Sequence, residues 1–144
     1  MSQIDEQDAR ISVIVGDEHS DFADKLGAFY AHLRASLKLP CDVTGIEDFY
    51  WEEFYVLGPG DSAEYVELRK TQPSYEDLFE LQSIEKDVSS EWMMFPWEDL
   101  AACVVRKSDG KKFFLGLAEV KSVDENSPNY QLLDDYAVWF VNNR

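Results

Sequence analysis

The chain has 144 residues, the usual size of one domain, and 45% of them are hydrophobic, so we expect a packed core. Asp and Glu number 29 against 13 Lys and Arg, a formal net charge of −16. Such a field repels nucleic-acid phosphates and anionic membranes and favours cations or basic partners. Because we find neither a membrane span nor a signal-peptide pattern, we expect a cytoplasmic protein.

The N-terminal part is predicted to hold one helix. Residues 1–9 are polar and acidic and are expected to be disordered. The β-branched stretch 11–15 fits a short strand. A helix is predicted over 20–38, with Ser20 or Asp21 as its cap. Its apolar stripe follows helical spacing and predicts a core face: Phe22, Leu26, Phe29, Tyr30, Leu33 and Leu37.

The middle of the chain, 41–124, is predicted to be β-rich. Strands are expected at 41–46, at 50–57 and 63–70 around the turn Gly58-Pro59-Gly60-Asp61, and at 77–84. The clearest hairpin is 100–117, where Asp109-Gly110 supplies a tight turn. The apolar segment 92–97 is expected to cover the sheet, or alternatively to form an exposed patch that binds a partner.

The last helix is predicted over 127–142. Ser127 can cap it and Pro128 suits its first turn. Asp134 and Asp135 are expected on its flank and outer face, opposite the inner face formed by Leu133, Tyr136, Ala137 and Phe140. The whole chain, 1–144, is therefore predicted to be a single α+β domain. We expect a small SH3-like antiparallel β-barrel or bent sheet flanked by an N-terminal and a C-terminal helix.

No sequence pattern indicates an enzyme. There is no Gly-x-Ser-x-Gly elbow and no phosphate-binding loop. His19 and His32 lack the spacing of zinc ligands, and Cys41 and Cys103 are interpreted as two buried thiols. Carboxylates are so abundant that a glycosidase-like pair has no specificity.

Metal binding is the chemistry that the acids favour. Crowded carboxylates repel one another, and a divalent cation such as Ca²⁺, which prefers oxygen ligands, relieves that repulsion. One cluster lies at 47–53 and another around the final helix, where 124–135 matches an EF-hand loop poorly. The candidate metal ligands are Glu47, Asp48, Glu52, Glu53, Asp134 and Asp135.

Two stretches resemble a known family. The run from Lys107 to Asp124, followed by Ser127-Pro-Asn-Tyr-Gln-Leu-Leu-Asp-Asp-Tyr-Ala-Val-Trp-Phe-Val141, is similar to the C-terminal part of the small acidic calcium-binding proteins of the CcbP type, known from cyanobacteria. Leu37-Lys-Leu-Pro-Cys-Asp-Val43 resembles that family's entry into its first strand. The resemblance implies an SH3-like barrel with flanking helices and Ca²⁺ held by surface carboxylates, without identifying individual ligands.

Two functions follow as hypotheses. The first is a non-catalytic cytoplasmic calcium-binding protein. The alternative is an acidic protein-interaction module, for example an immunity-type inhibitor that masks a basic partner, with aromatic anchors in 92–97.

Overall fold

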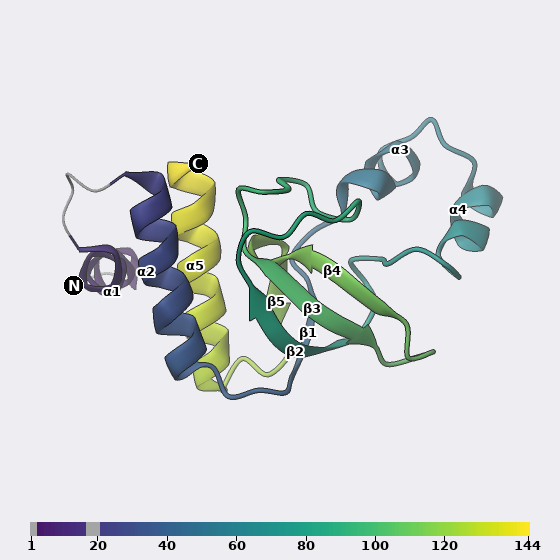
Figure 1. Ribbon diagram of the computed structural model, residues 1–144. Coiled ribbons are helices and arrows are strands. Elements are labelled where there is room, and N and C mark those ends of the chain that lie inside the picture. Colours follow the sequence, from purple (N-terminus) through teal and green to yellow (C-terminus); the bar gives the residue numbers. More distant parts are fainter. Residues whose placement is uncertain (1–2, 17–20) are drawn as a thin grey trace.

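The computed structural model describes residues 3–16 and 21–144 and shows an open antiparallel sheet with helices at both ends of the chain (Figure 1). The sheet has five strands in the order β4-β3-β2-β1-β5. They are β1 (Cys41–Gly45), β2 (Phe79–Glu85), β3 (Ala101–Arg106), β4 (Lys112–Gly116) and β5 (Val120–Ser122). The α+β class and the flanking helices are as predicted, and of the two predicted forms the structure shows a sheet, while the closed SH3-like barrel is not confirmed. Closure would need β4 to pair with β5, and these strands lie at opposite edges of the sheet.

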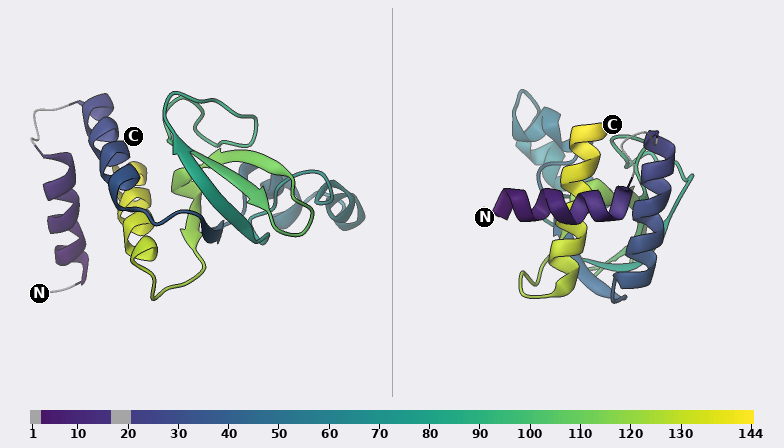
Figure 2. Two further views of the ribbon diagram at one scale, coloured as in Figure 1. Left: turned by 60° about the horizontal axis from the view of Figure 1, so that its bottom comes forward. Right: turned by 90° about the vertical axis from the view of Figure 1, so that its left-hand side faces the viewer.

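Three helices gather on one side of the sheet: α1 (Gln3–Val15), α2 (Phe22–Ser36) and α5 (Pro128–Asn143). Figure 2 shows α1 crossing over α2 and α5. The strand expected at 11–15 is wrong, and the described part of 1–9 also lies in α1. The reason is that Ile11, Ile14 and Val15 fall at helical spacing and pack together against the core.

The caps of the two longest helices follow from the sequence. Asp21 accepts a hydrogen bond from the backbone N–H of Asp24 at 2.8 Å, whereas Ser20 and His19 lie outside the described residues. Ser127 caps α5, and the whole predicted inner face of α5 is buried. Aromatic rings join the two helices, with Phe22 stacked on Trp139 at 5.3 Å between ring centres.

Residues 50–68 form helices, so the two strands expected at 50–57 and 63–70 are wrong. The segments are η1 (Tyr50–Glu52), α3 (Glu53–Val56) and α4 (Ser62–Leu68), which extend away from the sheet in Figure 1. Asp61 caps α4 through the N–H of Ala63 at 3.0 Å. Tyr65 stacks on Tyr55 at 5.4 Å, so the aromatic residues pack against each other here and not against a neighbouring strand.

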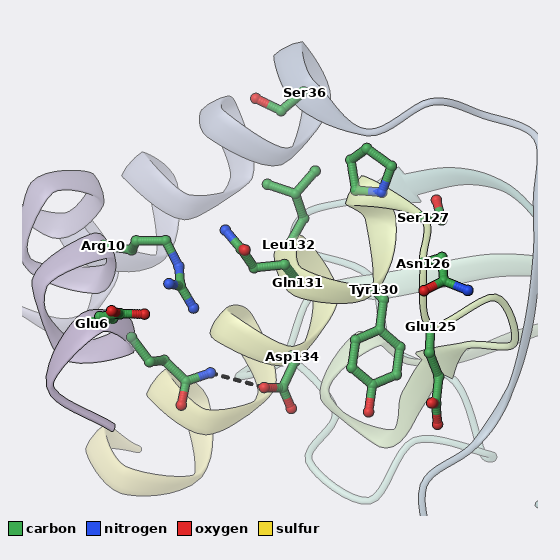
Figure 3. A pocket seen from close by; sticks show the side chains of 12 residues that line it. Glu6, Arg10, Ser36, Glu125, Asn126, Ser127, Tyr130, Gln131, Leu132 and Asp134 are labelled. Carbon is green, nitrogen blue, oxygen red and sulfur yellow. Dashed lines mark hydrogen bonds between the residues drawn. The ribbon is translucent and has the colours of Figure 1, made fainter. Parts of the chain in front are cut away.

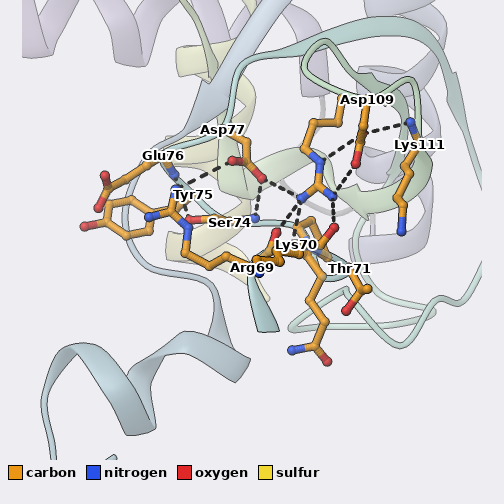
Figure 4. A network of polar contacts seen from close by, with 12 residues as sticks. Arg69, Lys70, Thr71, Ser74, Tyr75, Glu76, Asp77, Asp109 and Lys111 are labelled. Atoms are coloured by element: carbon orange, nitrogen blue, oxygen red, sulfur yellow. Dashed lines mark hydrogen bonds and ion pairs between the residues drawn. The ribbon is translucent and has the colours of Figure 1, made fainter. Parts of the chain in front are cut away.

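The hairpin expected over 100–117 is confirmed as the β3–β4 pair. Strand β2 has a bulge between Leu81 and Ser83, and this explains why its buried positions run Phe79, Leu81 and then Ile84. The last residue of β3, Arg106, is buried. Three residues that it contacts, Lys70, Asp77 and Asp109, are labelled in the polar network of Figure 4.

The guanidinium of Arg106 joins three parts of the chain. It donates to both carboxylate oxygens of Asp109 at 3.1 and 2.8 Å, and to Asp77 at 3.0 Å. It also donates to the backbone carbonyls of Arg69, Lys70 and Gln72 at 2.9 to 3.1 Å. Arg106 therefore fixes the residues that directly follow the helical segment 50–68 to the sheet.

The segment 92–97 is divided between core and solvent. Met93 is buried, and Trp92 and Phe95 pack against the core. Trp97 is 67% exposed and adopts a φ of 72°. The segment thus covers the core with some side chains and presents others to water.

Two further sequence expectations concern exposure. Cys41 and Cys103 are free thiols in β1 and β3, and both are half-buried, whereas full burial was expected. No helix in the described ranges 3–16 and 21–144 is long and apolar enough to cross a membrane.

Candidate functional site

Both predicted acidic clusters contribute to one groove of about 570 Å³. Glu47 and Asp48 come from the loop after β1, Glu53 from the start of α3, and Asp134 from α5. We call this the acidic groove. Its fifth carboxylate belongs to Glu119, in the 3-10 turn η2 (Leu117–Glu119). Four of the six candidate ligands therefore line a single surface hollow, although they are up to 87 positions apart in the sequence.

The carboxylates of the acidic groove do not converge on one point in this structure. Within the described residues, no group of three or more His, Cys, Asp or Glu side chains lies close enough together to hold a metal ion. Glu47, Glu53 and Asp134 are exposed and Asp48 is half-buried, so their side chains can move at little cost. A cation in the groove would have to draw them together and would keep water among its ligands.

The carboxylate of Glu52 is turned into the protein and lies outside the groove. One of its oxygens accepts from the backbone N–H groups of Phe49 and Tyr75 at 3.1 and 2.8 Å. The other accepts from the hydroxyls of Ser74 and Tyr65 at 2.7 and 2.5 Å. Glu52 therefore links η1 to the loop before β2. Partial burial of the Tyr65 hydroxyl, together with its hydrogen bond to Glu52, raises the pKa of Tyr65.

Asp135 is buried under α1, which corrects its expected place on the flank or outer face of α5. The reason is the α1 helix, which the sequence did not lead us to expect. Arg10 donates to both oxygens of Asp135 at 3.0 and 3.1 Å, and this bond raises the pKa of Arg10. Gln7 donates to Asp135 at 2.9 Å and to the neighbouring Asp134 at 2.8 Å.

A second cavity of about 870 Å³ lies beside these contacts. Figure 3 shows Glu6 and Arg10 of α1 facing Asp134 of α5, with Glu125 from the preceding loop farther along. Because Arg10 is present, this cavity has mixed charge, unlike the acidic groove. Asp134 borders both hollows.

Two carboxyl groups lie where sequence reasoning placed no site: Asp99 is buried and Glu119 is half-buried. Burial raises the pKa of Glu119 to about 7 and the pKa of Asp99 to about 8. Asp99 accepts from the hydroxyl of Tyr136 at 2.5 Å and from the N–H of Ala118 at 3.1 Å. A β-carbon on Gly116 would collide with both carboxylates, so the two groups flank that glycine closely.

The sequence contains only a weak indication of these two carboxyl groups. Asp99 directly precedes the apolar run of β3, and Glu119 stands between apolar residues of η2 and β5. Glu119 is a lone acid in an apolar stretch, which indicates a buried carboxyl group, whereas Asp99 directly follows Glu98 and resembles the many acids of the surface.

Comparison with known proteins supports a resemblance of fold. No protein-family model matches the chain, and no curated protein matches its sequence. The crystal structure of Anabaena CcbP is similar with a TM-score of 0.60 and 14% identity, over 96% of this chain and 92% of that one. A calcium binding protein in the calcium-binding form is similar with a TM-score of 0.56 and 15% identity, over 99% of this chain and 97% of that one. The CcbP-like fold that the sequence indicated is therefore confirmed over nearly the full length of the chain.

Proposed function

We propose that this chain is a non-catalytic, cytoplasmic calcium-binding protein whose ion is held in the acidic groove. The proposed ligands are Glu47, Asp48, Glu53 and Asp134. The observation that carries the proposal is that the groove gathers the four proposed ligands from three separate segments, while its lining holds no Lys or Arg among the described residues. The two neighbours in fold support the same chemistry, since one is named a calcium binding protein in the calcium-binding form.

Calcium suits this groove better than a smaller cation. Ca²⁺ accepts six to eight oxygens in flexible geometry, so carboxylates on a loop and two helices can satisfy it together with water. Mg²⁺ demands near-ideal octahedral geometry, which separate mobile side chains do not provide. Glu52 and Asp135 are left out of the ligand set, because both residues are buried and both carboxylate oxygens of each accept hydrogen bonds within the protein. Asp134 is kept because it is exposed and its bond from Gln7 reaches Oδ2.

Calorimetric titration of chelator-treated protein with Ca²⁺ tests the proposal. We expect measurable heat and a higher melting temperature, since an ion that binds only the folded state stabilises it. Glu53→Gln should weaken binding by about tenfold through loss of one charged ligand. Glu67→Gln is the matched control, because Glu67 is an exposed acid of α4 outside the groove.

The outcomes are distinct. If neither heat nor a thermal shift is seen at millimolar Ca²⁺, the chain does not bind calcium. If Glu53→Gln and Glu67→Gln weaken binding equally, the ion responds to the overall negative field and not to the acidic groove.

A further inference from the structure

The acidic groove also has a large apolar surface. Four bulky apolar side chains on its lining are open to water: Leu57 is 77% exposed, Val141 63%, Met94 44% and Ile46 43%. They come from four separate parts of the chain, and the folded structure places them around one hollow. A contiguous apolar surface that is rimmed by polar groups is characteristic of a binding site for another molecule.

The charges on the rim have one sign. Its five carboxylates are accompanied by no basic side chain in the part of the lining that the structure describes. Arg144 lies next to one lining residue, with its guanidinium carbon 3.5 Å from the centre of the Phe95 ring. The protein thus already places one guanidinium against an aromatic ring of the groove, in a cation–π contact.

We propose that the acidic groove docks a basic, amphipathic helical segment of a partner protein. Apolar side chains on one face of that segment would lie against Leu57, Met94 and Val141, and flanking Lys or Arg would pair with the carboxylates of the rim. This is the helix-in-groove mode of recognition, in which apolar anchors recur every three or four residues. The chain's charge excludes nucleic acids and anionic membranes as occupants, because both present phosphates.

Calcium and the segment would compete for the groove. Both neutralise Glu47, Glu53 and Asp134, so this part of the inference rests on the proposed calcium function. Docking itself does not, because apolar contact and charge pairing need no metal ion.

Fluorescence anisotropy with a labelled model peptide tests the docking. The probe is a peptide of about 14 Leu and Lys residues with leucines on one helical face, measured with a chelator present and at about 0.15 M salt, where long-range charge effects are screened. Two control peptides have Glu in place of Lys, or Ser in place of Leu. We expect the Leu/Lys peptide to bind at least about tenfold more tightly than either control.

A matched pair of variants locates the site. Val141→Lys places a cation in the groove, whereas Val66→Lys makes the same change on α4, outside the groove and at 62% exposure against 63% for Val141. Both side chains lie at the surface, so both variants should fold. We expect Val141→Lys to weaken peptide binding by about tenfold and Val66→Lys to leave it within about twofold.

Several results would overturn the inference. Equal binding of the Lys/Ser peptide would show that charge alone is recognised, and equal weakening by the two variants would place binding outside the groove. If sedimentation shows a dimer of the native chain that Val141→Lys dissociates, the occupant is a second copy. The calcium function is tested separately. If the peptide still binds in millimolar Ca²⁺, and titration of the protein with Ca²⁺ gives no heat, only the calcium function is refuted.

Discussion

Arg106 offers the sharpest test of how the fold is held together. Its side chain is only 3% exposed, and it makes six hydrogen bonds to two carboxylates and three carbonyls. Arg106→Met keeps the aliphatic stem and removes every one of these donors. Breaking a buried ion pair costs about 3–5 kcal/mol. Because Asp77 and Asp109 are 16% and 32% exposed, water can partly replace the lost partner, and we expect about 3 kcal/mol.

That loss is large for a domain whose total stability is about 5–15 kcal/mol. At about 2–4 °C per kcal/mol for a chain of this size, the melting temperature should fall by roughly 10 °C. Urea unfolding followed by circular dichroism measures the free energy directly. Arg106→Lys retains the charge but cannot form the planar fork, so it should lose about half as much.

The neighbouring residue supplies the control. Lys107 pairs with Asp42 at 2.8 Å, but the two side chains are 41% and 45% exposed. Lys107→Met should therefore cost less than about 0.5 kcal/mol. If Arg106→Met and Lys107→Met unfold at the same urea concentration, the network around Arg106 does not anchor the helical segment 50–68. The argument from the burial of Arg106 is then refuted.

Three further perturbations test the buried carboxyl groups. Since burial raises the pKa of Asp99 to about 8 and that of Glu119 to about 7, the folded state binds more protons than the unfolded chain, and the free energy of unfolding should fall as the pH rises between about 4 and 8. Urea titrations across that range should show a smaller fall for Asp99→Asn, and an unchanged slope would contradict the assignment. Gly116→Ala should lower the free energy of unfolding by about 1–3 kcal/mol in the same assay, because the new β-carbon meets the carboxylates of Asp99 and Glu119. An unchanged stability would show that these two carboxylates can move apart. Glu52→Ala should lower the free energy of unfolding by about 1–3 kcal/mol more than Glu52→Gln, because only glutamine keeps an acceptor for the two backbone N–H groups. Calorimetric melting measures both variants. If Glu52→Gln is the less stable of the two, Glu52 does not hold these N–H groups.

Local patterns predicted those elements whose signals lie within a few residues of each other. Asp109-Gly110 identified the β3–β4 hairpin, because a tight turn needs residues that tolerate positive φ, and Gly110 has a φ of 76°. Ser127-Pro128 identified the start of α5, where the cap and the first-turn proline act locally.

The failures came where tertiary contacts decide the outcome. Residues 63–70 alternate like a strand, but no neighbouring strand is available to them, and Tyr65 packs on Tyr55 within a helical cluster. The same limit applies to the site. Acid density predicted Glu47 and Asp134, yet only the fold places them on one groove, and it removes Glu52 and Asp135 by giving them hydrogen-bond donors.

The open sheet leaves two outer strands whose far sides pair with no other strand among residues 3–16 and 21–144. Such edges invite strands from other molecules to add on, which leads to aggregation. Here β5 has three residues and offers little length for pairing, while β4 begins at Lys112, directly after Lys111. In a chain with few basic residues, two of them stand where like charges on a second copy would repel an incoming strand. Apolar replacements at these lysines would remove that repulsion and leave the β4 edge more open to the addition of a strand.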